Sequence, residues 1–195
     1  MIKMNIKMML LSDAIFGNGS SIPGAEDISI LCDGNGFPYY KGGTFKGIFR
    51  EELGRYLELC GKSETEIRKI VTELLGMGLS DDDHEQIIFS DFTMAPAARK
   101  TILEEIGIGK PEIVTDILTN VRTFTKIEKN GVAARGSLRS VRCVDQGLSF
   151  YSEISCPEAD RNLVTEVLGM IKWVGSMRNR GLGKVRITVL EEVRW

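Results

Sequence analysis

A glycine-rich basic segment constrains the fold of this chain more than any other feature. The segment runs from Gly175 to Lys184 and separates an apolar helical pattern from the strand-like run 185–190. Its three glycines permit positive φ angles and close backbone approach, which predicts a tight turn between that helix and that strand. The cations Arg178, Arg180 and Lys184 would allow this turn to hold a phosphate. The alternative interpretation is a turn with a solvated basic face.

Two common nucleotide-binding loops are excluded at this segment. A Walker A loop has a glycine where this chain has Arg178. A Walker A loop is also followed by a helix, whereas this segment is followed by a strand-like run. A dinucleotide-binding loop needs a third glycine, but the pair Gly181 and Gly183 is followed by Arg186 at that place. Any phosphate binding by this loop therefore follows another pattern.

Composition favours one ordinary globular domain. The chain has 195 residues, of which 43% are hydrophobic and 27% are charged. No apolar run approaches the ~18 residues of a membrane span, and the lysine-interrupted start does not resemble a signal peptide, so we expect a cytoplasmic protein without membrane association. The cysteines lack metal-binding spacing, which favours reduced thiols, at Cys32, Cys60, Cys143 and Cys156. The single histidine, His84, follows the acidic run 81–83, for which a solvated loop is favoured over a metal site.

Charge is unevenly distributed along the chain. The net charge of −2 argues against indiscriminate nucleic-acid binding. Basic residues nevertheless gather at 41–55, 122–142 and 178–186, whereas acidic residues gather at 64–85 and 104–116. Local basic faces on a nearly neutral protein are compatible with binding RNA in a defined groove. Ordinary variation of surface charge is the competing interpretation.

Periodicity predicts a single α+β domain. Strands are expected at 3–11, 28–32, 86–92, 148–154 and 185–190, and helices at 45–59, within 61–85 and at 158–173. Thr44 is the expected N-cap of the first helix, and Asp33 opens a predicted turn. The order of strand, helix, strands, helix and strand is that of a ferredoxin-like or RRM-like core with an inserted helical segment at about 61–118. The RNP aromatic motifs of an RRM are absent, so base stacking on the sheet is not expected.

A basic hairpin is predicted at about 122–145. Asn130-Gly131 is a favoured two-residue turn, and its flanks carry many cations but few large apolar side chains. We therefore expect this hairpin to project from the domain, or to have at least one solvated face.

Three segments resemble the RAMP superfamily in the order in which that superfamily carries them. The segment YYKGGTFKGIFREEL, at 39–53, looks like the one that opens its first helix, although Lys41-Gly-Gly-Thr44 replaces the usual proline and serines. The run 122–141 and the strand 148–154 are similar to its hairpin and following strand, and 175–185 resembles its C-terminal glycine-rich loop. Within the superfamily, the chain is most similar to backbone subunits of type III CRISPR effector complexes, which act in antiviral defence.

The resemblance implies roles for particular residues. It implies that guide RNA is bound along its backbone by cations at Lys46, Arg50, Arg122, Lys126, Arg178, Arg180 and Lys184. It also implies that Asp27, in the loop after the first strand, carries endoribonuclease activity on target RNA and is a ligand of Mg²⁺. Glu26 and Asp13 are the alternatives to Asp27. Taken without the resemblance, Asp27 is a turn former or an N-cap.

Three functional hypotheses follow from this resemblance. The first is a subunit that binds guide RNA and cleaves paired target RNA with Mg²⁺, in an assembly with related RAMP subunits. The second is a structural subunit that binds guide RNA without cleaving. The third is a guide-RNA-processing endonuclease, which usually needs a catalytic histidine, whereas His84 lies outside the matched segments.

Overall fold

The computed structural model describes residues 1–17, 19, 27–76, 87–129 and 131–190. Four features named above, Glu26, the acidic run 81–83, His84 and Asn130, lie outside these described residues. Among the helices of the described ranges, none combines the length and the apolar character that a membrane crossing needs.

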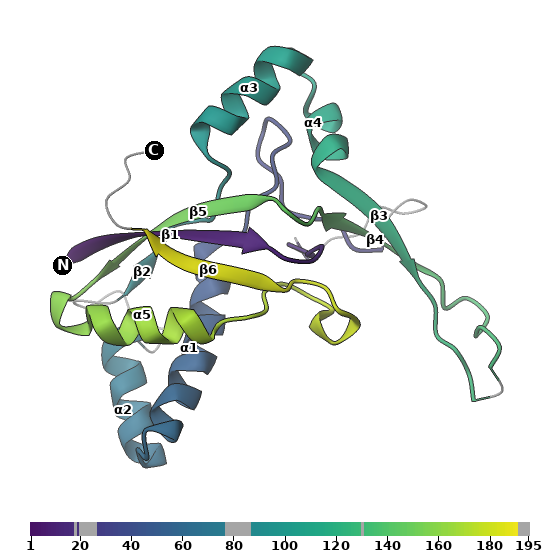
Figure 1. Cartoon of the computed structure of the whole chain (residues 1–195). Helices are drawn as coiled ribbons and strands as arrows, with labels where there is room; N and C mark the ends of the chain where they lie inside the picture. Colours follow the sequence, from purple (N-terminus) through teal and green to yellow (C-terminus); the bar gives the residue numbers. More distant parts are fainter. Residues whose placement is uncertain (18, 20–26, 77–86, 130, 191–195) are drawn as a thin grey trace.

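A four-stranded antiparallel sheet forms the centre of the protein (Figure 1). Strand β1 (Ile2–Leu10) lies between β5 (Ser149–Cys156) and β6 (Val185–Leu190), and the short β2 (Ile88–Phe89) pairs with the outer side of β5. The strand order is therefore β2-β5-β1-β6. The strands predicted at 3–11, 148–154 and 185–190 are confirmed, with small shifts at their ends.

One face of the sheet is covered by helices and forms the main core. Every second residue of β1, from Met4 to Leu10, is buried, as the two-residue repeat of a strand requires. Helices α1 (Gly42–Leu59) and α5 (Arg161–Met170) lie on this side, and α2 (Glu64–Leu75) packs against α1. The chain is thus an α+β protein, as the sequence predicts.

The start of α1 differs from the prediction. Thr44 is not the N-cap, because the helix already begins at Gly42 and its cap residue is Lys41. The side chain of Asp91 replaces a local cap, since its Oδ1 accepts the Gly42 N–H at 2.8 Å. A Cβ at Gly42 would lie 2.2 Å from the carbonyl oxygen of Phe89, so glycine allows the helix start to approach β2. This contact is invisible in the local sequence because Asp91 is 49 residues away.

Other boundaries are also corrected by tertiary contacts. The region 28–32 makes isolated bridges instead of a strand, and the strand predicted at 86–92 is reduced to Ile88–Phe89. The last helix begins after a 3₁₀ turn, η1 (Glu158–Asp160), and ends at Met170 because Trp173 pairs with Lys184 in an extended conformation.

A second layer and a hairpin lie beyond the other face of the sheet (Figure 1). Helices α3 (Pro96–Ile106) and α4 (Pro111–Leu118) lead into β3 (Thr119–Phe124), which pairs with β4 (Arg139–Val144) in a separate two-stranded sheet. Beyond these strands the hairpin extends away from the body of the protein. A small second core joins the base of the hairpin to the rest of the chain, at Ile15, Val141, Cys143 and Leu182.

Candidate nucleic-acid interface

The glycine-rich loop is held rigidly against the segment that follows β1. The Gly183 N–H donates to the carbonyl of Asp13 at 2.7 Å, and the Ser176 N–H donates to that of Ile15 at 3.2 Å. Gly175 and Gly183 have φ angles of 73° and 79°. A Cβ at position 175 would lie 2.4 Å from the Ile15 carbonyl oxygen. A Cβ at position 183 would lie 1.9 Å from a backbone oxygen. Both positions therefore require glycine.

The loop presents its cations to solvent. Arg178, Arg180 and Lys184 are exposed, and the first and third of these side chains have no hydrogen bond or ion pair with the part of the chain that the structure describes. The Arg180 guanidinium lies over the ring of Phe124 in β3, 5.2 Å from its centroid. This contact places the loop beside the base of the hairpin. The three side chains form a cationic surface on a fixed backbone, which is the arrangement that a phosphate chain requires.

Tyr40 holds the start of the glycine-rich loop from the buried side. Its ring is buried, and its hydroxyl oxygen accepts the Gly175 N–H at 3.3 Å. Burial raises the pKa of the Tyr40 phenol, and the nearby charge of Arg178 acts in the opposite direction. Tyr40, two residues before α1, is thus in direct contact with the start of the loop.

The cations predicted on α1 are not gathered at the loop. Arg50 donates two hydrogen bonds to the end of α2, to the carbonyls of Leu75 at 3.2 Å and Gly76 at 3.0 Å. This guanidinium satisfies carbonyls that the helix leaves without partners. Lys46 lies one turn earlier on the same side of α1 and is half-buried. In the part of the chain that the structure describes, Arg50 is thus engaged with the end of α2, and no hydrogen bond or ion pair connects it to the glycine-rich loop.

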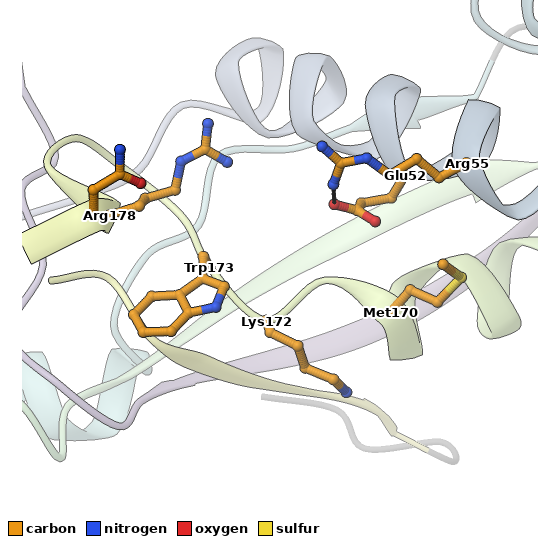
Figure 2. Close-up of a pocket in the computed structure, with 7 residues that line it drawn as sticks. Glu52, Arg55, Met170, Lys172, Trp173 and Arg178 are labelled. Carbon is orange, nitrogen blue, oxygen red and sulfur yellow. Dashed lines mark hydrogen bonds and ion pairs between the residues drawn. The ribbon is translucent and has the colours of Figure 1, made fainter. Parts of the chain in front are cut away.

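A different side of α1 faces the loop, through residues that sequence reasoning missed. Glu52 and Arg55 of α1 line a hollow of ≈ 640 Å³ together with Arg178 and Trp173 (Figure 2). The helical spacing of Glu52 and Arg55 on the side away from Arg50 is the signal that could have found them. Trp173 carried no such signal, because its apolar helical context predicted a helix instead of the extended segment that exposes it.

Asp13, one alternative catalytic candidate, is a buried structural residue. Its side chain is 4% exposed, and Oδ2 forms an ion pair of 2.5 Å with Arg122 and accepts from the Asn120 amide at 3.1 Å. Oδ1 accepts the Gln146 N–H at 3.0 Å. Asp13 thus ties the end of β1 to β3 and to the turn before β5. Arg122, predicted to contact RNA, has its charge balanced by this carboxylate.

Asp27 is joined to the start of β4. Its Oδ2 accepts the Ser140 N–H at 2.7 Å, and its own N–H donates to the Ser140 carbonyl at 2.7 Å. Its Oδ1 accepts from the Arg139 guanidinium at 3.4 Å. The carboxylate is therefore at the surface, close to the hairpin, but both of its oxygens have protein partners.

The residues around Asp27 do not form a metal site on their own. Within the described ranges, no three His, Cys, Asp or Glu side chains come together in a group that could hold a metal ion. Asp27 supplies one carboxylate, and the Arg139 cation lies against one of its oxygens. Magnesium is commonly held by one or two protein carboxylates together with water and substrate phosphates. Among the described residues, Asp27 therefore has too few protein ligands around it for a resident ion, and Mg²⁺ there would need ligands from bound RNA.

Beyond its paired base, the hairpin exposes both cations and aliphatic side chains. Lys126 is exposed, and the backbone around it is held by a hydrogen bond from its N–H to the Ser137 hydroxyl at 3.1 Å. Ile127, Val132 and Leu138 are more than half exposed, at 58%, 61% and 65%. Large apolar side chains that gather on a projecting element are typical of a surface that contacts a partner.

Comparison with solved structures shows where this fold recurs. Two solved chains share the fold at 12% sequence identity. One is in the cryo-EM structure of the Type III-B Cmr-beta bound to cognate target RNA, with a TM-score of 0.70 and coverage of 97% of both chains. The other is in the cryo-EM structure of the apo state of Type III-B Cmr-beta, with a TM-score of 0.71 and coverage of 98% of both. No curated protein sequence matches.

The family follows from the sequence itself. The sequence model of the RAMP superfamily matches residues 7–186, and the chain belongs to that superfamily. The matched range includes the start of α1, the hairpin and the glycine-rich loop, so the resemblance seen in those three segments is confirmed at the level of the superfamily.

Proposed function

We propose that this chain is a backbone subunit of a type III CRISPR effector complex that binds guide RNA along its phosphate backbone. The observation that carries the proposal is the set of exposed cations on the glycine-rich loop, Arg178, Arg180 and Lys184, which lie on a rigid backbone without acidic partners in the described residues. Membership of the RAMP superfamily and the shared fold with chains of Cmr-beta support it. The strand order β2-β5-β1-β6, with α1 and α5 on one face, supports a ferredoxin-like core.

Phosphate contacts suit a carrier of many guide RNAs. Guide sequences vary, so a common carrier has to recognise the phosphates and 2′-hydroxyl groups that all RNAs share. Partners in this proposal are guide RNA, target RNA and related RAMP subunits of the complex.

Charge reversal tests RNA binding. The variant Arg180→Glu/Lys184→Glu should weaken binding to every RNA sequence alike and reduce the slope of log K against log salt. The matched control is Arg68→Glu/Lys69→Glu on α2, since these exposed cations neighbour Glu64 and Glu73 instead of the loop. Filter binding at several salt concentrations measures both quantities. Equal affinity and equal slope in the two variants and the wild type would refute the proposal.

Target cleavage is proposed as a second activity of the same subunit, with Asp27 as the catalytic residue. The 2′-hydroxyl of the RNA would attack the adjacent phosphorus in line and expel the 5′-oxygen, leaving a 2′,3′-cyclic phosphate. The protein then has to align these atoms and stabilise negative charge. Asp27 and RNA phosphates would together hold Mg²⁺, which supplies neutralisation of phosphate charge.

A non-cleaving scaffold is the second candidate, and a specific observation favours it. The Asp27 carboxylate already bonds Ser140 and Arg139 at the base of the hairpin, which is the role of a structural brace. Such a brace would hold the hairpin in position without contributing to the reaction.

Three variants separate catalysis from bracing in an assembled complex. Asp27→Ala and Asp27→Asn should abolish cleavage if the carboxylate is catalytic, and Arg139→Ala should leave it unchanged, because it removes the ion pair but keeps Asp27. Product analysis should find 2′,3′-cyclic phosphate ends, and EDTA or a 2′-deoxy scissile nucleotide should prevent cleavage. Cleavage by Asp27→Ala at the wild-type rate would identify the subunit as a scaffold.

A further inference from the structure

The hollow beside the glycine-rich loop places an aromatic ring, Trp173, next to Arg178, and the RNA-backbone proposal does not use this ring. It has a volume of ≈ 640 Å³ and lies between α1, the end of α5 and η2 (Arg178–Arg180) (Figure 2). Its lining consists of Glu52, Arg55, Met170, Lys172, Trp173, Arg178 and Asn179. The volume is within the range of pockets that take small organic ligands, roughly 300–1,000 Å³.

Trp173 is exposed on a rigid support. The large indole is 36% exposed, although tryptophan is usually highly buried. Its backbone pairs with Lys184, and the flanking hydrogen bonds are Val174 N–H to the Gly183 carbonyl and Val185 N–H to the Lys172 carbonyl, each 2.8 Å. The ring is thus held on a short ribbon formed with the glycine-rich loop itself. A fixed, partly exposed aromatic ring can stack on a nucleobase with little loss of conformational entropy.

The charged groups around the ring differ in their availability. The Arg55 guanidinium is paired with Glu52 at 2.6 Å, and the Lys172 ammonium donates to the Gly169 carbonyl. The Arg178 guanidinium, by contrast, has no hydrogen bond or ion pair with the described residues. In Figure 2 Lys172 turns away from the space that Trp173 shares with Arg178 and the Glu52–Arg55 pair. The groups available to a ligand are therefore the Trp173 face and the Arg178 guanidinium, whereas the Glu52 carboxylate is paired with Arg55 and its side chain is only 16% exposed.

We propose that this hollow is a subsite for a single unpaired nucleobase of RNA, which stacks on Trp173 while Arg178 contacts the adjoining phosphate. Stacking on an aromatic plate tolerates every base, since each has a π face. The inference rests on the proposed RNA binding and adds a contact to a base where that proposal has contacts to phosphates alone.

Fluorescence of Trp173 tests the subsite without altering it. In a Trp195→Phe background Trp173 is the single tryptophan, because the chain contains two. The probes are an oligouridylate of about 10 nucleotides and an abasic oligomer of equal length. Oligouridylate should quench the emission at saturation, and the abasic oligomer should bind through its phosphates without equal quenching. Equal quenching by the two oligomers would overturn the subsite.

Affinity gives an independent readout. Trp173→Ala should weaken oligouridylate binding by about 5- to 150-fold, as expected for the loss of one stacked base, and Trp173→Phe should retain most of the affinity. The salt slope of Trp173→Ala should equal that of the wild type, because no phosphate contact is removed. Thermal melting verifies that the variants are folded.

The outcomes separate this inference from the proposed function. Unchanged affinity in folded Trp173→Ala, with RNA binding still lost in the loop charge-reversal variant, would remove the subsite and leave the backbone proposal intact. Absence of RNA binding by the wild type would overturn both. Loss of association with another protein subunit in Trp173→Ala, without any effect on RNA, would show that the hollow takes a protein side chain and would also overturn the inference.

Discussion

Asp13→Ala should destabilise the protein far more than loss of a comparable ion pair at the surface. Asp13 is 4% exposed and joins β3 and the turn before β5 through its carboxylate. Replacement by alanine removes an ion pair to Arg122 and acceptors for the Asn120 amide and the Gln146 N–H. Breaking a buried pair costs about 3–5 kcal/mol, and each unsatisfied buried group costs about 1–3 kcal/mol.

The loss of stability in Asp13→Ala should lie at the lower end of these two energy ranges. The Arg122 side chain is 52% exposed, so water can solvate its charge once Asp13 is removed. Gln146 is also exposed. We therefore expect a loss of about 2–3 kcal/mol in the free energy of unfolding. For a chain of this length, this corresponds to a decrease of roughly 4–12 °C in Tm.

Asp116→Ala is the matched control. Asp116 also pairs with an arginine of the two-stranded sheet, Arg142 at 2.8 Å, but it is 67% exposed. Arg142 keeps a hydrogen bond to the Thr119 hydroxyl at 2.9 Å in this variant. Exposed pairs contribute about 0–1 kcal/mol, so Asp116→Ala should change stability little.

Urea unfolding followed by circular dichroism measures both variants. With an m-value of roughly 2–3 kcal/mol/M, Asp13→Ala should lower the midpoint by about 1 M. Asp13→Asn, which keeps one acceptor but loses the charge, should fall between Asp13→Ala and the wild type. Equal midpoints for Asp13→Ala and Asp116→Ala would refute the argument that burial makes Asp13 a structural centre.

Four further predictions follow from the described geometry. Gly183→Ala should destabilise the fold by more than Gly131→Ala in thermal melts, because both have positive φ, which alone costs about 1–2 kcal/mol, but a Cβ at 183 also meets a backbone oxygen at 1.9 Å. Burial, and secondarily the charge of Asp13, raises the pKa of Cys143 to about 11, so iodoacetamide at pH 8.5 should label exposed Cys60 and spare Cys143 by mass spectrometry; equal labelling would contradict this. Since the unfolded thiol loses its proton from about pH 9, stability from this group should be complete below that pH and decline as pH rises towards 11. Deletion of residues 125–138 should leave a folded domain that fails to assemble into regular filaments with RNA, whereas normal assembly by light scattering and normal footprints would refute a role for the hairpin in contacting partners.

Sequence patterns were most informative where they describe one element at a time. The two-residue repeat of β1 identifies this strand correctly, since strand burial depends on neighbouring residues, and β3 pairs with β4 within the region predicted as a hairpin. The glycines at 175 and 183 also identify a loop with tight backbone contacts, and the structure supplies the atoms that make those contacts. Membership of the RAMP superfamily is confirmed for the same reason, because its motifs are local runs.

Only the tertiary structure decided which charges are available and which are neutralised. The resemblance to the RAMP superfamily made Arg50, Arg122, Asp13 and Asp27 candidates for a functional site. Each of these residues has a partner that is distant in sequence. Arg50 donates to the carbonyls at the end of α2, and Arg122 forms an ion pair with Asp13. Asp27 accepts a hydrogen bond from the start of β4.

Dependence on contacts that are distant in sequence also explains why the roles of Trp173 and Asp91 were not predicted. A side chain becomes exposed, or becomes a helix cap, through packing against elements elsewhere in the chain, and neither the exposed indole nor the cap of α1 has a signal within one turn of sequence. The sequence by itself therefore predicted the long strands of the central sheet, the helices α1 and α5, their order and the superfamily. The fold determined which of the cations remain free to bind a phosphate chain, because electrostatic pairing depends on distance in space and not along the chain.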